Sequence, residues 1–265
     1  MDKVKLGKLE VSRFIIGSNP FSGFSHQGDK MNLEMQHYFT VARIKETLKQ
    51  AEKAGITTII ARADNHVIRT LWEYWDEGGK LQWVAQTCPG VGPTEKVAQM
   101  AIDGGAKAVY VHGGVMDYCL ANNNFDDPLK GIELIRKAGL PVGIAGHNPE
   151  VFVWAEKNWN MDFYMCAYYN AAHRDKDAEK KSNQPEWFLE EDRQKMADTI
   201  KGLKRPVIHY KVLAAGRNDP KDALPFAAKT MRPTDAVCVG VYTKSKPGMV
   251  TEDVKLFEKA WKQYH

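Results

Sequence analysis

The chain alternates short apolar segments with longer segments in which apolar residues recur at helical spacing. The short segments are almost continuously apolar, as strands buried on both faces of a parallel sheet are. Eight strands are predicted, at residues 14–17, 57–61, 82–85, 108–111, 141–145, 162–166, 206–209 and 236–240. Helices are predicted at residues 41–54, 67–75, 93–104, 128–138 and 250–264, and another begins near residue 149.

This order of elements predicts a fold of the α/β class. Parallel strands must be joined by crossovers, usually helices, and the crossovers have one hand. A chain of 265 residues is the size of a single (β/α)8 TIM barrel, and a doubly wound open sheet is the alternative. No linker or low-complexity segment divides the chain, so we expect residues 1–265 to form one domain.

Composition and charge narrow the class of protein. The net charge of +4 comes from 37 basic and 33 acidic residues with no basic tail, which argues against a nucleic-acid partner. No apolar run approaches the roughly 20 residues that cross a bilayer, which argues against a membrane partner. The N-terminal segment has no apolar signal region and the four cysteines are widely spaced. These features favour free thiols, a cytoplasmic location and a small-molecule substrate.

Polar side chains follow the predicted strands, at the end where barrel enzymes carry their active sites. The residues concerned are Asn19, Asp64, Asn65, His66, Gln86, Thr87, His112, His147, Asn148, Tyr168, Asn170, Tyr210, Lys211, Tyr242, Thr243 and Lys244. Three of the eight histidines, His66, His112 and His147, are in this set together with Asp64. Imidazole binds metals and titrates near neutral pH, so we expect these side chains to share one cavity.

Two long segments, residues 19–40 and 170–187, follow the first and sixth strands. Both leave the C-terminal end of the predicted barrel, where loops form lids and specificity walls. The second segment is rich in lysine, aspartate and glutamate, and a solvated charged loop is the alternative interpretation.

Several segments resemble the aldo-keto reductases. Residues 6–13 are similar to the N-terminal hairpin of that family, and residues 54–58 to the entry of its second strand. Val111-His112 matches the strand-four histidine, Tyr168-Tyr169-Asn170 the strand-six tyrosine and asparagine, and residues 210–216 the strand-seven stretch. The resemblance covers nearly the whole chain. It implies an aldo-keto reductase-like barrel, an N-terminal β-hairpin and, for ordinary members, NADPH-dependent carbonyl reduction.

The residues at the family's catalytic positions depart from its pattern. His66 stands where the resemblance places the proton-donating tyrosine, Ala61 replaces an aspartate and Thr87 a lysine, whereas His112 is retained. Cys166 replaces a glutamine that contacts the nicotinamide. Residues 249–253 lack the arginine and asparagine that hold the adenosine phosphate. These departures argue against NADP binding and NADPH reductase activity, and they indicate a divergent branch.

The leading hypothesis is therefore a non-redox enzyme, either a lyase, an isomerase or a hydrolase. Its substrate would be a small carbonyl compound or sugar derivative at the C-terminal mouth of the barrel. The candidate catalytic residues are His66, His112, Asp64 and Lys211. A divalent metal, Zn²⁺ or Mn²⁺, would be held by His66, His112, His147 and Asp64; without it, His66 and His112 form an acid–base pair.

Other polar residues are assigned to substrate binding: Asn19, Asn148, Tyr168, Asn170, Tyr210, Arg217 and Lys244. One alternative is an NADP-binding oxidoreductase with altered chemistry, which would use Tyr210, Asn148 and Lys244. The other alternative is a catalytically silent barrel that binds a ligand.

Overall fold

Eight parallel strands close into a barrel in the computed structural model, which describes residues 1–172 and 186–265. The strand order is β10-β3-β4-β5-β6-β7-β8-β9, so each neighbour in space is a neighbour in sequence except at the closure of β10 on β3. The strands are β3 (Phe14–Gly17), β4 (Thr58–Arg62), β5 (Gln82–Gln86), β6 (Ala108–Val111), β7 (Val142–Gly146), β8 (Phe163–Ala167), β9 (Val207–Tyr210) and β10 (Ala236–Gly240). The predicted TIM barrel is confirmed and the open sheet is wrong.

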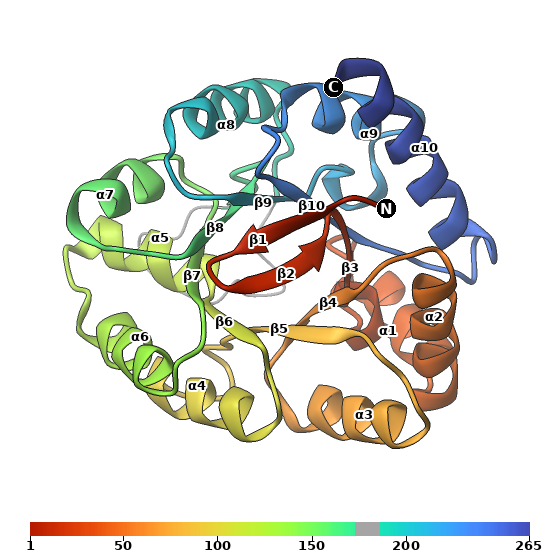
Figure 1. The fold of residues 1–265 in the computed structure, drawn as a ribbon, viewed down its shortest axis with the longest axis horizontal. Coiled ribbons are helices and arrows are strands. Elements are labelled where there is room, and N and C mark those ends of the chain that lie inside the picture. The colour runs from red at the N-terminus through yellow and green to blue at the C-terminus, as the bar shows by residue number, and fades with distance from the viewer. Residues whose placement is uncertain (173–185) are drawn as a thin grey trace.

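Helices surround the barrel (Figure 1). They are α2 (Val41–Lys53), α3 (Asn65–Asp76), α4 (Thr94–Asp103), α6 (Asp126–Lys137), α7 (Glu150–Asn158), α8 (Glu190–Gly202), α9 (Pro220–Thr230) and α10 (Met249–Tyr264). The predicted helices agree with the structure to within a few residues. Local signals explain this agreement: the Thr40 side chain caps α2 by accepting the Arg43 N–H, and the Asp64 side chain caps α3 by accepting the Val67 N–H.

Helices α8 and α9 were given no predicted bounds, and two helices at the C-terminal end of the barrel, α1 and α5, were not predicted at all. Helix α1 (Asp29–Tyr38), preceded by the short helix η1 (Asn19–Ser22), lies in the expected long loop. Helix α5 (Gly113–Asn122) directly follows β6. It begins with two glycines, which are poor helix formers, and six of its residues are buried. A helix buried on several faces has no one-sided apolar pattern to detect.

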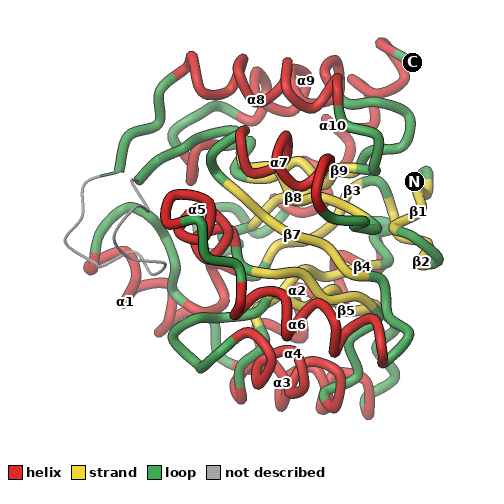
Figure 2. Tube along the Cα trace, turned by 90° about the vertical axis from the view of Figure 1, so that its left-hand side faces the viewer, coloured by secondary structure: helices red, strands yellow, loops and turns green. Residues whose placement is uncertain are grey.

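An antiparallel hairpin of β1 (Lys3–Leu6) and β2 (Leu9–Ser12) covers the end of the barrel where the strands begin. Val4, Leu6 and Val11 are buried and pack with the apolar side chains of the barrel interior. The hairpin that the resemblance implied is therefore confirmed. It lies at the opposite end from α1 and α5 (Figure 2), so it closes the bottom and leaves the C-terminal mouth for ligands.

The alternation of side chains along the strands determines which residues point into the C-terminal mouth of the barrel. Ile60, Val84 and Ala145 belong to the apolar interior of the barrel, whereas residues between them pack outward against the helices. The next inward positions are Arg62, Gln86 and His147, two residues further along each strand or just past its end. A polar ring thus follows directly on the apolar core.

No helix in the described parts of the chain is long and apolar enough to span a bilayer. The division of residues 1–265 into one domain stays a prediction.

Candidate active site

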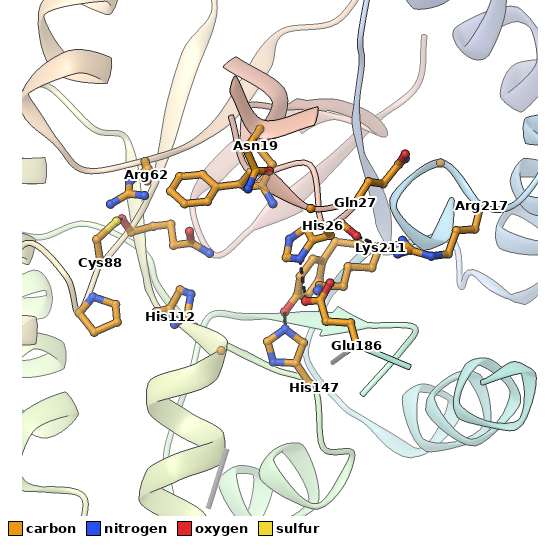
Figure 3. Close-up of a pocket in the computed structure, with 18 of the residues that line it drawn as sticks. Asn19, His26, Gln27, Arg62, Cys88, His112, His147, Glu186, Lys211 and Arg217 are labelled. Atoms are coloured by element: carbon orange, nitrogen blue, oxygen red, sulfur yellow. Dashed lines mark hydrogen bonds and ion pairs between the residues drawn. The ribbon is translucent and has the colours of Figure 1, made fainter. Parts of the chain in front are cut away.

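A cavity of about 730 Å³ opens at the C-terminal ends of the strands. This volume lies in the range of small-molecule sites, roughly 300–1,000 Å³. Arg62, Cys88 and His112 line one side, and Gln27, Lys211 and Arg217 line the other (Figure 3). His147 lies between the two sides and Asn19 lies opposite it.

A chain of three polar side chains, Asp117, His147 and Tyr210, reaches into the cavity from behind. Asp117 of α5 is buried, and its Oδ2 lies 2.7 Å from Nδ1 of His147. Nε2 of His147 lies 3.3 Å from the hydroxyl of Tyr210, the last residue of β9. Since a carboxylate only accepts hydrogen bonds, Nδ1 of His147 carries a proton. Nε2 accepts the tyrosine O–H when the ring is neutral and donates to the tyrosine oxygen when the ring is protonated.

Backbone contacts hold the three side chains Asp117, His147 and Tyr210 in place. Oδ1 of Asp117 accepts the N–H groups of His147 and Asn148, at 3.0 and 3.1 Å. Gly113, at the start of α5, lets the helix approach: an added Cβ would lie 3.1 Å from both the His147 ring and the Tyr210 hydroxyl. A side chain at residue 113 would therefore push on both members of the chain.

His112 presents a defined nitrogen. Its Nδ1 accepts the N–H of Gly114 at 3.1 Å, which caps α5, and its own N–H donates to Thr87 Oγ1. Because Nδ1 is an acceptor, the proton of the neutral ring is on Nε2. His112 lines the cavity at the strand ends.

Arg62 ends β4 and is oriented by two neighbours. Its Nε lies 2.7 Å from Oδ2 of Asp64, and its guanidinium lies 4.7 Å from the centre of the Phe24 ring. Close by, burial raises the pKa of the Cys88 thiol to about 11. That thiol is therefore neutral and is not a nucleophile at ordinary pH.

Hydrogen bonds of His26 and Gln27 hold the segment before α1 at the cavity mouth. Nε2 of Gln27 donates to the carbonyl of Ala215 at 2.6 Å, and Nη2 of Arg217 donates to the carbonyl of His26 at 2.8 Å. Nδ1 of His26 lies 2.8 Å from Oε1 of Glu186. The lid role of residues 19–40 stays a prediction, and most of the other expected lid, residues 173–185, lies outside the described residues.

Six of the candidate residues line the cavity: Asn19, His112, His147, Tyr210, Lys211 and Arg217. Six others do not: Asp64, His66, Asn148, Tyr168, Asn170 and Lys244. His66 is exposed on the first turn of α3, because Asp64 starts that helix and turns the chain outward. The structure thus brings His112 and His147 to one cavity but not His66.

The remaining candidates have other contacts. The buried Tyr168 hydroxyl lies 3.0 Å from both His209 Nδ1 and Thr230 Oγ1, behind the barrel wall. The Asn148 side chain accepts the N–H of Glu150 at 3.1 Å, at the start of α7. Lys244 pairs with Glu34 at 2.8 Å. The N–H of Asn170 donates to Asp192 at 3.1 Å.

Sequence reasoning missed Arg62 and Asp117. The strand alternation could have found Arg62, since it lies two positions after Ile60 on the same face of β4. No local pattern marks Asp117, because it lies on the buried helix that periodicity did not reveal.

The sequence matches no protein-family model and no curated protein. Solved structures are similar at low identity. A protein from Pseudomonas aeruginosa assigned as an aldo-keto reductase has a TM-score of 0.64 at 15% identity, covering 97% of this chain and 94% of that one. An aldo-keto reductase from Bacillus halodurans, in its holo form, has a TM-score of 0.61 at 11% identity, covering 100% and 96%. At these identities the likeness shows the fold: an aldo-keto reductase-like barrel, as the resemblance implied.

A third barrel gives a lower score. A truncated 3-deoxy-D-arabino-heptulosonate 7-phosphate synthase from Thermotoga maritima has a TM-score of 0.54 at 15% identity, covering 99% and 90%.

These comparisons contradict the leading functional hypothesis. The reductase neighbours favour the oxidoreductase alternative, and nothing in them supports a non-redox lyase, isomerase or hydrolase. The expected cofactor, a divalent metal without NADP, is corrected in the same way. The described residues hold no cluster of three or more histidine, cysteine or acidic side chains suited to a metal ion. The outward turn of His66 is the physical reason that the expected ligand set does not assemble.

Proposed function

We propose that this protein is a nicotinamide-dinucleotide-dependent oxidoreductase that interconverts a carbonyl and an alcohol on a small molecule. The observation that carries the proposal is the Asp117–His147–Tyr210 chain, which brings a tyrosine hydroxyl to the cavity of an aldo-keto reductase-like barrel. The residues that replace the family's usual catalytic residues, such as His66, then imply that another side chain donates the proton. The reaction class, carbonyl reduction with a dinucleotide, would be retained.

The cavity fits a dinucleotide beside a small substrate. Its volume of about 730 Å³ exceeds what a small carbonyl compound needs. Lys211 and Arg217 provide cations on one side and would hold the phosphate groups. Bound there, the dinucleotide supplies or accepts the hydride. Lys244 is not assigned to it, because this residue pairs with Glu34.

Tyr210 is the proposed proton donor for carbonyl reduction. Its hydroxyl gives a proton to the carbonyl oxygen and takes one from Nε2 of protonated His147. Asp117 stabilises the resulting positive charge on His147 through the contact at Nδ1. His147 regains its proton from solvent between turnovers, and alcohol oxidation runs the same path in reverse.

His112 is the proposed second contact to the carbonyl oxygen. The tautomer set by Gly114 places a proton on Nε2, which can donate to the oxygen as negative charge develops on it. Two donors, His112 and Tyr210, would then define where the carbonyl lies.

The test begins with titration of NADH and NADPH, following the fluorescence of the reduced nicotinamide, and with turnover of small aldehydes and ketones. Replacing Tyr210 by phenylalanine (Tyr210→Phe) should lower kcat about 100-fold or more, since positioned acids contribute roughly 10²–10⁴-fold. Dinucleotide affinity should stay within a few-fold. Tyr264→Phe is the matched control, because Tyr264 is 42% exposed and far from the cavity lining.

Two results would overturn the proposal. One is the failure of both dinucleotides to bind at millimolar concentration. The other is full turnover by Tyr210→Phe, which would leave an oxidoreductase with another acid. The four cysteines are free thiols, and this supports a reducing cytoplasmic location as part of the proposal.

A further inference from the structure

One side of the cavity presents hydrogen-bond donors from three adjacent strands. Arg62 at the end of β4 is the register partner of Gln86 at the end of β5. His112 directly follows β6, the next strand, and all three residues line the cavity. Figure 3 shows Arg62 and His112 on the same side, away from Lys211 and Arg217.

The Arg62 side chain is held by its neighbours at the edge of the cavity. Asp64 contacts Nε, and the Phe24 ring covers one face of the guanidinium. Asp64 is itself engaged as the cap of α3 and does not line the cavity. Arg62 also forms a side-chain hydrogen bond with the Cys88 thiol, and 22% of the Arg62 side chain is accessible.

Asp64 is the carboxylate paired with Arg62, and it contacts Nε at 2.7 Å. Cys88 also interacts with Arg62, but burial raises the pKa of its thiol to about 11 and keeps it neutral, so it adds no negative charge. The acidic residues of the cavity lining, Asp29 and Glu186, come from other segments, and Glu186 contacts His26.

We propose that Arg62, with Gln86, binds the carboxylate of the substrate, so that the protein acts on small oxo acids and the hydroxy acids they form. This inference rests on the proposed function and names its substrate class. A guanidinium matches a carboxylate through two parallel N–H···O bonds. A phosphate dianion fits less well, because Arg62 is the one permanent cation on this side of the described lining.

The reaction balances within the proposed site. A hydride from the reduced dinucleotide forms a C–H bond at the oxo carbon, and the C=O π bond breaks. The oxygen takes the Tyr210 proton, giving a hydroxy acid and the oxidised dinucleotide. The carboxylate is unchanged and serves to position the carbonyl near Tyr210.

The experiment compares straight-chain oxo acids, beginning with pyruvate, with their neutral methyl esters. Wild-type kcat/KM should favour the acid over its ester. Arg62→Gln should lower kcat/KM for the acid about 10- to 100-fold more than for the ester, because a hydrogen bond to a charged group contributes strongly to binding. Arg62→Lys should recover part of the loss. Arg69→Gln, on the exposed face of α3, is the charge-matched control and should change neither value.

A binding measurement separates the failure of this inference from failure of the proposed function. Calorimetric titration with pyruvate, its methyl ester and inorganic phosphate needs no dinucleotide. Pyruvate binding that Arg62→Gln abolishes supports the carboxylate site even if no turnover is found. Dinucleotide-dependent turnover with equal loss on acid and ester overturns the carboxylate site and leaves the oxidoreductase standing. Tighter binding of phosphate than of any oxo acid overturns the assigned substrate class.

Discussion

The proposed acid, Tyr210, depends on a residue that does not touch the cavity. Asp117 is 7% exposed and uses Oδ1 for two backbone N–H groups, so only Oδ2 is left to face the His147 ring. This arrangement fixes the ring orientation and its tautomer, in the way that a buried carboxylate orients a catalytic histidine elsewhere. Asp117 is therefore a positioning residue.

Asp117→Asn tests that role at nearly constant volume. An amide in place of Oδ2 favours the wrong tautomer of His147 and no longer stabilises its charged form, so kcat should fall ~100-fold or more, while KM changes little. Steady-state kinetics over a range of pH measure this, with Asp126→Asn on the exposed start of α6 as control. A variant that loses only thermal stability, with kcat intact, would show that Asp117 is merely structural.

At the scale of elements, the segment before α1 contacts the short helix η2 (Ala214–Gly216) at the edge of the cavity mouth. Lys211 and Ala215 have φ values of 57° and 54°, in the left-handed region that residues with a Cβ rarely occupy. Backbone strain of this kind is often found at ligand sites. Here it brings the Ala215 carbonyl to the Gln27 side chain.

Gln27→Ala removes that contact. The loss of one hydrogen bond, about 0.5–1.5 kcal/mol, should speed hydrogen exchange at residues 24–28 by roughly 2- to 10-fold. KM should rise by a similar factor. Gln99→Ala is the control, since Gln99 makes a comparable hydrogen bond to Asp103 on the surface of α4. Unchanged exchange at residues 24–28 would mean that other contacts, such as Arg217 with His26, hold this segment alone.

At the scale of the whole molecule, two buried carboxylates make opposite contributions to the pH dependence of folding. Burial raises the pKa of Asp253, in the first turns of α10, from 3.8 to about 6. Burial also acts on Asp235, but its hydrogen bonds to His209 and Arg232 outweigh it and hold the pKa of Asp235 well below its usual range. Asp253 therefore opposes folding when it is ionised, whereas Asp235 favours folding when it is ionised.

The two carboxylates change the free energy of unfolding in different pH ranges. Well below pH 3.8 Asp253 is neutral in both states, and its penalty develops as pH rises from 3.8 to about 6 and is complete above that. Asp253→Asn should then raise the free energy of unfolding near pH 7 by roughly 1–2 kcal/mol, and the gain should vanish near pH 4. Asp235→Asn should destabilise near pH 7, and this loss should persist at pH 4 and shrink only at lower pH, below the ordinary pKa of 3.8. Denaturant unfolding at the two pH values measures both, and equal gains at each pH for Asp253→Asn would contradict the assignment.

The sequence alone determined the barrel. Strands of four or five residues carry their own apolar signal, and caps such as Asp64 with glycines such as Gly55 mark the helix ends. It also located the site at the C-terminal ends of the strands, because every parallel strand of a barrel ends on the same side. Six of the twelve candidate side chains do line the cavity there.

Only the tertiary structure decided which side chains work together. His66 and His147 both follow strands, but one is turned outward by a helix cap and the other is directed inward by the strand alternation. Asp117 meets His147 across 30 residues of sequence, through a helix without periodicity. Local patterns report the conformation of a segment, whereas a site depends on the directions of side chains from separate segments. For that reason a three-histidine metal site was expected and an Asp117–His147–Tyr210 chain was found.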